Sequence, residues 1–208
     1  MTRAIYRLPW RVDVTVRDGV AGIASGAALA RCIAAGLDAA GAPAPASIGL
    51  ILSDDAEVAE LNLQHMGKDG PTDVLSFPLL PPDAFPPHPG ATDRAIDTTT
   101  GTTTHTTTGT TTNTTTHTTT HTTTAFALPP GRRLHLGDIV VSVERAIEQA
   151  ETGRGGQTGD RRWAPADELR LLVIHGALHI CGWDHAEPAE EAAMRTLETL
   201  LLGSLAPA

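Results

Sequence analysis

Three histidines in the C-terminal part of the chain have the spacing of a metal site. His175 and His179 are four residues apart, so on a helix both imidazoles lie on one face, about one turn apart. Gly182 can adopt the left-handed conformation that ends a helix, which lets the chain fold back and bring His185 to the other two. Three neutral imidazoles form an open tetrahedral site for one Zn²⁺ ion, whose bound water has its pKa lowered to about 7.

The alternative is that these histidines are packed or solvated side chains, which is the usual role of a histidine on a helix. The stretch before them predicts a buried helix, because it contains the apolar residues Leu169, Leu171, Leu172, Val173 and Ile174. A buried imidazole needs a metal ion or a hydrogen bond. The apolar stretch therefore favours a metal site.

The spacing H-x3-H-x2-G-x2-H is also that of metzincin proteases, in which a glutamate after the first histidine is the general base. Gly176 occupies this position and cannot accept a proton. Met194 lies in a helix-like stretch, EEAAMRTLETL, and does not fit the methionine turn of those enzymes. A metalloprotease is therefore the less favoured function.

The rest of the sequence predicts the strands and helices that position this site. Alternating or continuous apolar residues predict strands at residues 10–16, 47–52, 73–77 and 136–141. One helix is predicted at 21–40, a second follows a cap at Ser53 or Asp54, and a third at 143–151 follows a cap at Ser142. Two more helices are predicted at 167–180 and 189–202. Because strands and helices mix without regular βαβ alternation, we expect an α+β fold with one small mixed sheet packed with helices.

One segment differs from the rest in composition. From residue 98 to 124, Thr fills three of every four positions and Gly, His or Asn fills the fourth. This stretch has no apolar residue to offset the entropy cost of ordering it, and Pro-rich stretches flank it. We therefore predict a single domain made of residues 1–79 and 132–208, interrupted by a long disordered Thr/Pro-rich insertion at 80–131.

The overall composition limits the possible functions. Among 208 residues, 15 Lys and Arg face 24 Asp and Glu, a net charge of −9, which excludes a uniformly basic coat but leaves room for a local basic groove. The two cysteines, Cys32 and Cys181, do not suggest a disulfide framework. Cys181 lies off the face of His179, so we expect a buried apolar role. No signal peptide or membrane span is predicted, which favours the cytoplasm.

Three stretches together resemble the YbeY family of bacterial rRNA maturation factors. H-G-A-L-H-I-C-G-W-D-H, residues 175–185, resembles the family signature H-G-x-L-H-x-x-G-x-D-H. P-T-D-V-L-S-F-P at 71–78 and L-G-D-I-V-V-S at 136–142 are similar to two strands of the family. The resemblance covers most of residues 10–202 outside the insertion, and the three motifs in this order are specific.

The resemblance implies a YbeY-like α+β fold with one Zn²⁺ held by His175, His179 and His185. It implies a metal-dependent, single-strand-specific endoribonuclease in 16S rRNA 3′-end maturation and ribosome quality control. The implied partners are rRNA, the small ribosomal subunit and its assembly factors, with no membrane and no DNA. An alternative from another class is a non-catalytic ribosome-assembly factor with a structural zinc.

Two aspartates are candidate catalytic residues. Asp184 adjoins the third histidine and could orient an imidazole or accept a proton, or it could be a surface residue at the helix end. Asp73 lies in the strand that the family places near the site, and its alternative role is to cap or turn the chain there. No residue stands out as the general base.

The sequence departs from the family pattern in a segment that bears on RNA handling. Met66 occupies the position at which family members commonly carry an Arg, to which contact with RNA phosphate is ascribed. Lys68, two residues later, lacks the bidentate fork of Arg. Trp163 and Trp183 could stack on bases, and their alternative role is packing.

Overall fold

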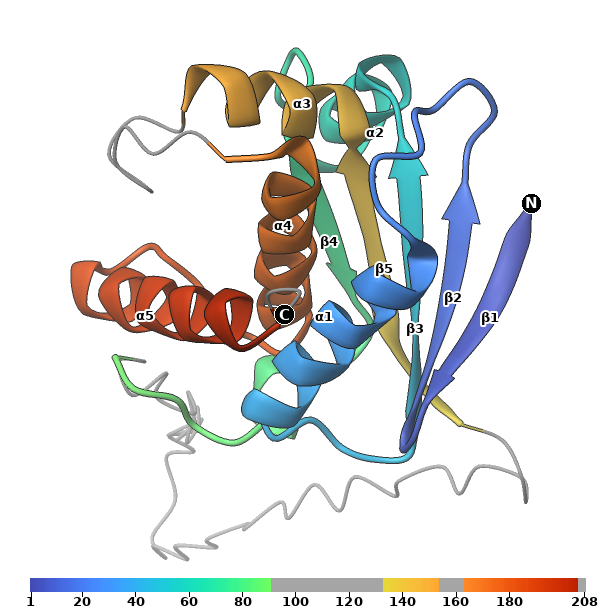
Figure 1. The fold of residues 1–208 in the computed structure, drawn as a ribbon. Coiled ribbons are helices and arrows are strands. Elements are labelled where there is room, and N and C mark those ends of the chain that lie inside the picture. Colours follow the sequence, from blue (N-terminus) through green and yellow to red (C-terminus); the bar gives the residue numbers. More distant parts are fainter. Residues whose placement is uncertain (91–132, 154–162, 206–208) are drawn as a thin grey trace, which may run out of the picture. The chain divides into compact units, whose positions relative to one another are not determined.

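The computed structural model describes residues 1–90, 133–153 and 163–205. Its strands are β1 (Thr2–Arg7), β2 (Trp10–Val16), β3 (Ala46–Ser53), β4 (Val74–Pro78) and β5 (Leu134–Ser142). Its helices are α1 (Gly26–Ala39), α2 (Asp55–Met66), α3 (Val143–Thr152), α4 (Pro165–Ile180) and α5 (Pro188–Ser204), with one short 3-10 helix, η1 (Pro82–Ala84). Figure 1 shows how these elements are arranged.

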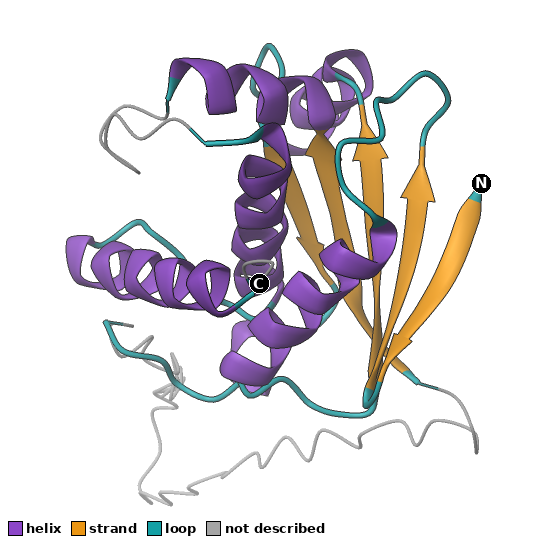
Figure 2. Ribbon diagram, in the orientation of Figure 1, coloured by secondary structure: helices purple, strands orange, loops and turns teal. Residues whose placement is uncertain are grey.

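The strands form a single five-stranded sheet in the order β1-β2-β3-β5-β4. The inner pairs β2–β3 and β3–β5 are parallel, whereas the outer pairs β1–β2 and β4–β5 are antiparallel. The sheet is therefore mixed, and helices pack against it (Figure 2). This confirms the predicted α+β fold with one small mixed sheet.

One face of the sheet carries the main core. Along β2, the alternating residues Trp10, Val12 and Val14 are buried, as expected for a strand with one covered face. Helix α1 contacts β1 and β2, helix α4 contacts β4 and β5, and α5 packs on α4. The central helix α4 is thus enclosed by the sheet and by other helices, which fixes the side chains that it carries.

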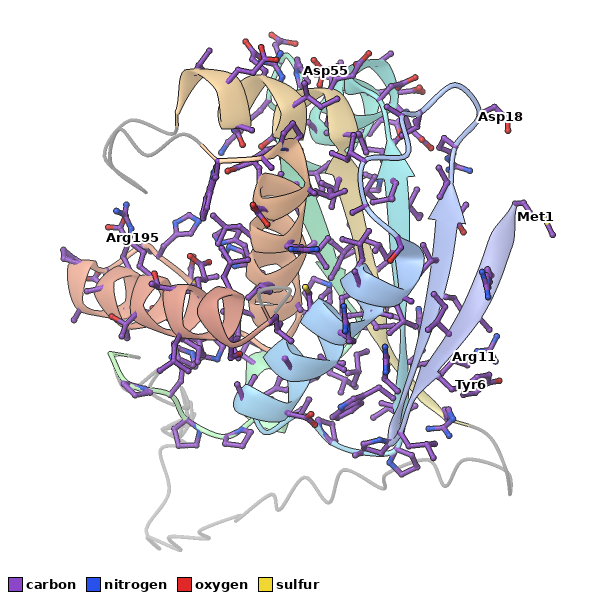
Figure 3. The ribbon with its side chains drawn as sticks, viewed as in Figure 1. Met1, Tyr6, Arg11, Asp18, Asp55 and Arg195 are labelled. Carbon is purple, nitrogen blue, oxygen red and sulfur yellow. The ribbon has the colours of Figure 1, made fainter. Side chains whose placement is uncertain are left out.

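The opposite face is covered only in part. Helix α2 packs there through a second apolar cluster, which contains Val58, Leu75 and Val140. Beyond it, Tyr6 of β1 lies opposite Arg11 of β2, and Figure 3 shows both side chains at the same end of these strands. Tyr6 is 58% exposed, so this part of the sheet faces solvent in the described chain.

Side-chain caps set the start of three helices. Ser25 Oγ accepts from Ala28 N at 3.2 Å, so α1 begins after Ser25 and not at residue 21 as predicted. Asp54 accepts from Glu57 N at 2.9 Å, which makes Asp54 the cap of α2. Ser142 caps α3, as the sequence predicts. Each cap satisfies a backbone N–H that the helix itself leaves free.

The structure describes only the first part of the predicted insertion. Residues 91–131 of the predicted insertion, which include the Thr-rich tract at 98–124, lie outside the described residues, so their predicted disorder stays a prediction. Residues 81–90, which the prediction assigned to the same insertion, are described and contact the domain: Phe85 is 6% exposed and belongs to the main core. Residues 80–90 therefore pack on the domain in the structure, and the apolar surface of Phe85 contributes to holding them there. In the part of the chain that the structure describes, no helix has the length and apolarity to cross a bilayer.

Candidate metal centre

Helix α4 carries the first two histidines of the candidate site. Its apolar positions are buried, among them Leu169, Leu172 and Ile174, as the sequence predicts for this stretch. On the same helix, His175 and His179 lie one turn apart, with ring centroids separated by 4.5 Å. The buried helix thus fixes the relative positions of the two imidazoles.

Gly176, the residue after His175, lies where helix α4 packs closely on the sheet. A Cβ atom at this position would lie 2.7 Å from Ile139 Cγ2 and 3.2 Å from Val74 Cγ2. The helix therefore approaches β4 and β5 so closely that a side chain here requires its neighbours to shift. A glutamate here, the general base of metzincin proteases, would be strained against the sheet, which is further physical evidence against the protease alternative.

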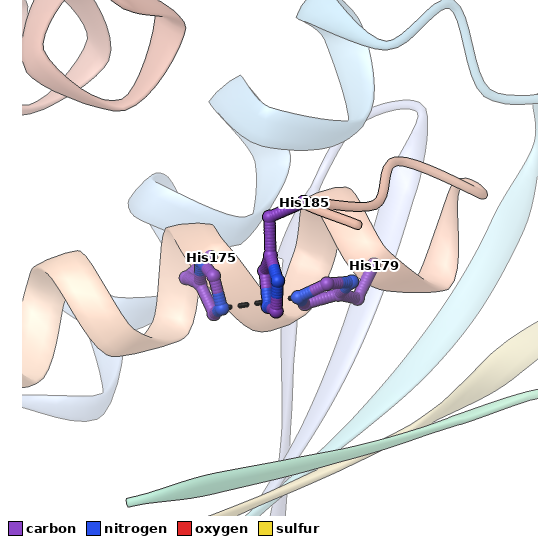
Figure 4. A group of neighbouring side chains, drawn as sticks. All are labelled: His175, His179 and His185. Carbon is purple, nitrogen blue, oxygen red and sulfur yellow. Dashed lines mark hydrogen bonds between the residues drawn. The ribbon is translucent and has the colours of Figure 1, made fainter. Parts of the chain in front are cut away.

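The chain bends after α4 and brings the third histidine to the first two. Gly182 has φ +83, and its N–H donates to the carbonyl of His179 at 3.0 Å. The bend expected at this glycine is therefore present. His185 then lies 5.1 Å from His179 and 5.7 Å from His175, measured between ring centroids. One possible ligand atom from each of the three residues lies within 4.8 Å of the others (Figure 4).

Hydrogen bonds on the far side of two rings fix their tautomers. His175 Nδ1 lies 2.6 Å from Glu198 Oε1, and His179 Nδ1 lies 2.8 Å from the carbonyl oxygen of Trp183. A carbonyl and a carboxylate only accept, so each Nδ1 carries the hydrogen. This leaves the Nε2 lone pairs of both rings pointing into the site, as in proteins in which histidine binds a metal.

The nitrogen atoms of the three histidines lie at distances that suit a bound cation. The Nε2 atoms of His175 and His179 are 3.0 Å apart, and two lone pairs at that distance repel unless a proton or a metal ion lies between them. Zn–N bonds of about 2.0–2.1 Å in a tetrahedral site place ligand nitrogens about 3.3 Å apart. Burial, followed by the nearby His175 and His185, lowers the pKa of His179 to about 4, which keeps this ring in the neutral form that binds metals. The three histidines could therefore hold a metal ion.

Glu198 contacts a candidate ligand, and the sequence does not reveal this contact directly. It lies on α5, where Glu190, Met194, Glu198 and Leu201 are all buried. These positions repeat at helical spacing, so two glutamates occupy an otherwise apolar face. A buried carboxylate needs a partner, and this pattern is the signal from which a role for Glu198 could have been inferred.

The two candidate catalytic aspartates have different surroundings. Asp184 Oδ1 accepts from the His185 backbone N–H at 2.8 Å, next to the third histidine. Asp73 Oδ1 accepts from the Val74 backbone N–H at 2.9 Å, and Oδ2 accepts from Gln149 Nε2 at 3.2 Å. Asp184 thus holds the backbone that carries a candidate ligand, whereas the Asp73 carboxylate holds the start of β4 against α3.

The other residues considered for RNA contact are distributed over the domain. Met66 is the last residue of α2 and is 47% exposed. Trp163 is half-buried and its Nε1 donates to Glu168 Oε2 at 2.6 Å. Trp183 is 6% exposed and stacks on His88, so it has the packing role that the sequence left as an alternative. Cys181 is buried, as expected.

Comparisons with known proteins agree with the motifs. The family model described as "Endoribonuclease YbeY" matches residues 24–206. A protein named "Endoribonuclease YbeY" from Roseiflexus castenholzii is 31% identical over 195 residues, which is 93% of this chain and 92% of that protein. Another of that name, from Salinispora tropica, is 37% identical over 168 residues, 81% of this chain and 80% of its own length. The solution structure of a protein from Thermotoga maritima has a TM-score of 0.44 and 20% identity, covering 92% of this chain and 88% of that one.

Proposed function

The chain belongs to the YbeY endoribonuclease family, and from this premise we propose that it is a zinc-dependent, single-strand-specific endoribonuclease. We propose that it acts in 16S rRNA 3′-end maturation and in ribosome quality control. Its partners would be rRNA, the small ribosomal subunit and its assembly factors, in the cytoplasm. The net charge of −9 suggests that protein partners contribute to binding of the RNA polyanion.

The observation that supports a metal-dependent reaction is the convergence of three imidazoles, two of which have their outer nitrogens hydrogen-bonded. His175, His179 and His185 would hold the ion, since their ligand atoms lie within 4.8 Å of one another. When bound, such an ion polarises a phosphoryl oxygen and activates water at neutral pH. Three protein ligands leave a coordination position open for that chemistry, as in catalytic zinc sites.

The remaining residues of the site prepare it for this role. Glu198 and the Trp183 carbonyl keep Nε2 of His175 and His179 free of hydrogen. Asp184 is the proposed catalytic residue nearest to the histidines in sequence, and its bond to the His185 amide favours a positioning role over proton transfer. Asp73 is the second proposed catalytic residue, but its bonds to Val74 and Gln149 favour a structural role.

Metal analysis combined with RNA cleavage tests the proposal. We expect purified wild-type protein to contain about one zinc per chain and to cleave a precursor of the 16S 3′ end. His175→Ala is expected to lose both the metal and the cleavage. His135→Ala is the matched control, because His135 is a half-exposed histidine of β5 that contacts Ser47 and Asp138.

The outcomes separate the alternatives. Wild-type protein that binds no metal, or a His175→Ala variant that cleaves at the wild-type rate, would contradict the proposal. Zinc in the wild type without any cleavage, together with a large loss of stability in His175→Ala, would support the assembly factor with a structural zinc. Zinc-dependent digestion of casein would support the metalloprotease.

A further inference from the structure

Residues 85–90 contact the loop that carries the third histidine. This segment, here called the His88 segment, follows β4 and η1 and is far in sequence from α4 and α5. Phe85 anchors it in the main core. At its other end, Gly90 approaches α5 so closely that a Cβ atom there would lie 2.6 Å from the backbone N of Glu190. The segment is therefore fixed at both ends against the domain.

His88 makes the central contacts of the segment. Its ring stacks on Trp183, with centroids 4.2 Å apart and an interplanar angle of 13°. Its Nε2 lies 3.3 Å from the carbonyl oxygen of Gly182 and 3.4 Å from Glu190 Oε1. Both neighbours are acceptors, so Nε2 carries the hydrogen and faces two groups that can receive it.

The residues that His88 contacts also hold the candidate ligands. The Trp183 carbonyl accepts from Nδ1 of His179, and Glu190 Oε1 accepts from the backbone N–H of Asp184 at 3.0 Å. The loop between α4 and α5 is therefore bound to His179 through the Trp183 carbonyl. It is also held by His88 and Glu190. His185 comes directly after Asp184, so a shift of this loop displaces it.

The identity of residue 88 supports more than a packing role. His88 Nδ1 is buried and has no hydrogen-bond partner among the described residues. A buried nitrogen without a partner is unfavourable, and an apolar ring could stack on Trp183 without that cost. The feature that favours histidine here is thus the donor Nε2, which reaches both the Gly182 carbonyl and the carboxylate of Glu190.

We propose that His88 is a positioning residue of the metal centre: it fixes the loop of Gly182, Trp183 and Asp184 and thereby the place of His185. The inference rests on the metal site of the proposed function and adds to it a segment outside the three family motifs. Loss of a group that hydrogen-bonds a ligand directly typically weakens metal binding by about ten- to a hundredfold, and His88, which contacts the loop and not a ligand, should have an effect at the lower end of that range. The consequence for this chain is faster release of zinc when the loop loses His88.

Transfer of zinc from the full-length protein to a coloured chelator tests this without RNA. We expect His88→Ala to release Zn²⁺ about tenfold faster than the wild type, and to change the visible absorption spectrum of the Co²⁺-loaded protein. His88→Gln keeps an N–H donor and should lie closer to the wild type than His88→Ala does. His65→Ala is the matched control, since His65 also packs on an aromatic ring, that of Phe77, with centroids 5.0 Å apart.

The inference is overturned if His88→Ala, folded by circular dichroism, releases zinc within twofold of the wild-type rate, or if His65→Ala accelerates release equally. If His88→Ala does not fold, His88→Phe serves instead, because it keeps a ring on Trp183 but removes the Nε2 donor to Gly182 and Glu190. Wild-type release by His88→Phe then overturns the inference. A wild-type protein that takes up no zinc would contradict the proposed function itself, whereas a zinc-loaded wild type with unchanged variants contradicts only the role of His88.

Discussion

At the scale of single residues, the partners of the imidazoles decide which nitrogen faces the metal position. Glu198 Oε1 lies 2.6 Å from His175 Nδ1, whereas His179 Nδ1 has a backbone carbonyl as its partner. A carboxylate raises the basicity of the ring that it binds more than a neutral carbonyl does. Of these two candidate ligands, His175 is therefore the one that depends on a single side chain.

Replacing that carboxylate should weaken metal binding. We expect Glu198→Gln to lower the affinity for zinc by about ten- to a hundredfold, because the amide carries no charge and can present its own N–H to Nδ1. Competition with a chelator of known affinity measures this effect. Glu191→Gln is the control, since Glu191 lies on the same helix and pairs with Arg195. Equal affinities of Glu198→Gln and the wild type would show that the Glu198 contact does not support the ligand.

At the scale of elements, the sequence reveals contacts within one helix but not contacts that depend on how distant elements pack. The spacing of His175 and His179 is fixed within one helix, so it could be predicted. Glu198 reaches His175 from α5, 23 residues later, and this approach depends on how two helices pack. His88 comes from a still more distant segment, and its stretch of proline and polar residues gives no periodic signal.

The strand β1 shows the same limit. Its sequence, TRAIYR, has mostly exposed side chains and lacks the apolar alternation that marks β2. It forms because its backbone pairs with β2 in an antiparallel register, from Thr2 with Thr15 to Arg7 with Trp10. Pairing of backbone groups at an edge leaves little trace in side-chain patterns, and the sequence therefore did not predict this strand.

The close packing of α4 on the sheet gives a second prediction. Gly176→Ala should destabilise the protein by about 1–3 kcal/mol, the usual cost of an extra methyl group in a packed core. The reason is that the new Cβ would lie 2.7 Å from Cγ2 of the buried Ile139. Urea unfolding followed by circular dichroism measures the difference in free energy of unfolding.

A second glycine provides the matched control for this substitution. Gly203 lies in α5, and a Cβ there would meet nothing within 4 Å. Gly203→Ala should change the stability by no more than about 0.5 kcal/mol, because Gly203 lies at the end of the helix with free space around it. A Gly176→Ala variant as stable as the wild type would mean that α4 and the sheet can separate without cost.

At the scale of the whole domain, the apolar core and the candidate metal centre are separate sources of stability. The main core links strands β2, β3 and β5 to α1, α4 and α5. The histidines lie at the side and end of α4, and His185 is exposed. In zinc fingers, by contrast, the metal replaces a core that is too small to fold alone. This domain has a core of its own, so we expect its fold to persist without a metal ion.

Removal of the metal should therefore lower the melting temperature without unfolding the protein. A ligand at a thousand times its dissociation constant stabilises the folded state by about 4 kcal/mol, and this amount is lost with the ligand. For a domain of roughly 150–250 residues, each kcal/mol corresponds to about 2–4 °C. We expect EDTA to shift thermal unfolding down by about 10 °C while it stays cooperative, and His175→Ala to melt at that lower temperature with or without EDTA. Loss of the circular dichroism signal at room temperature on chelation would instead assign the metal a structural role, because the core would then be unable to hold the fold alone.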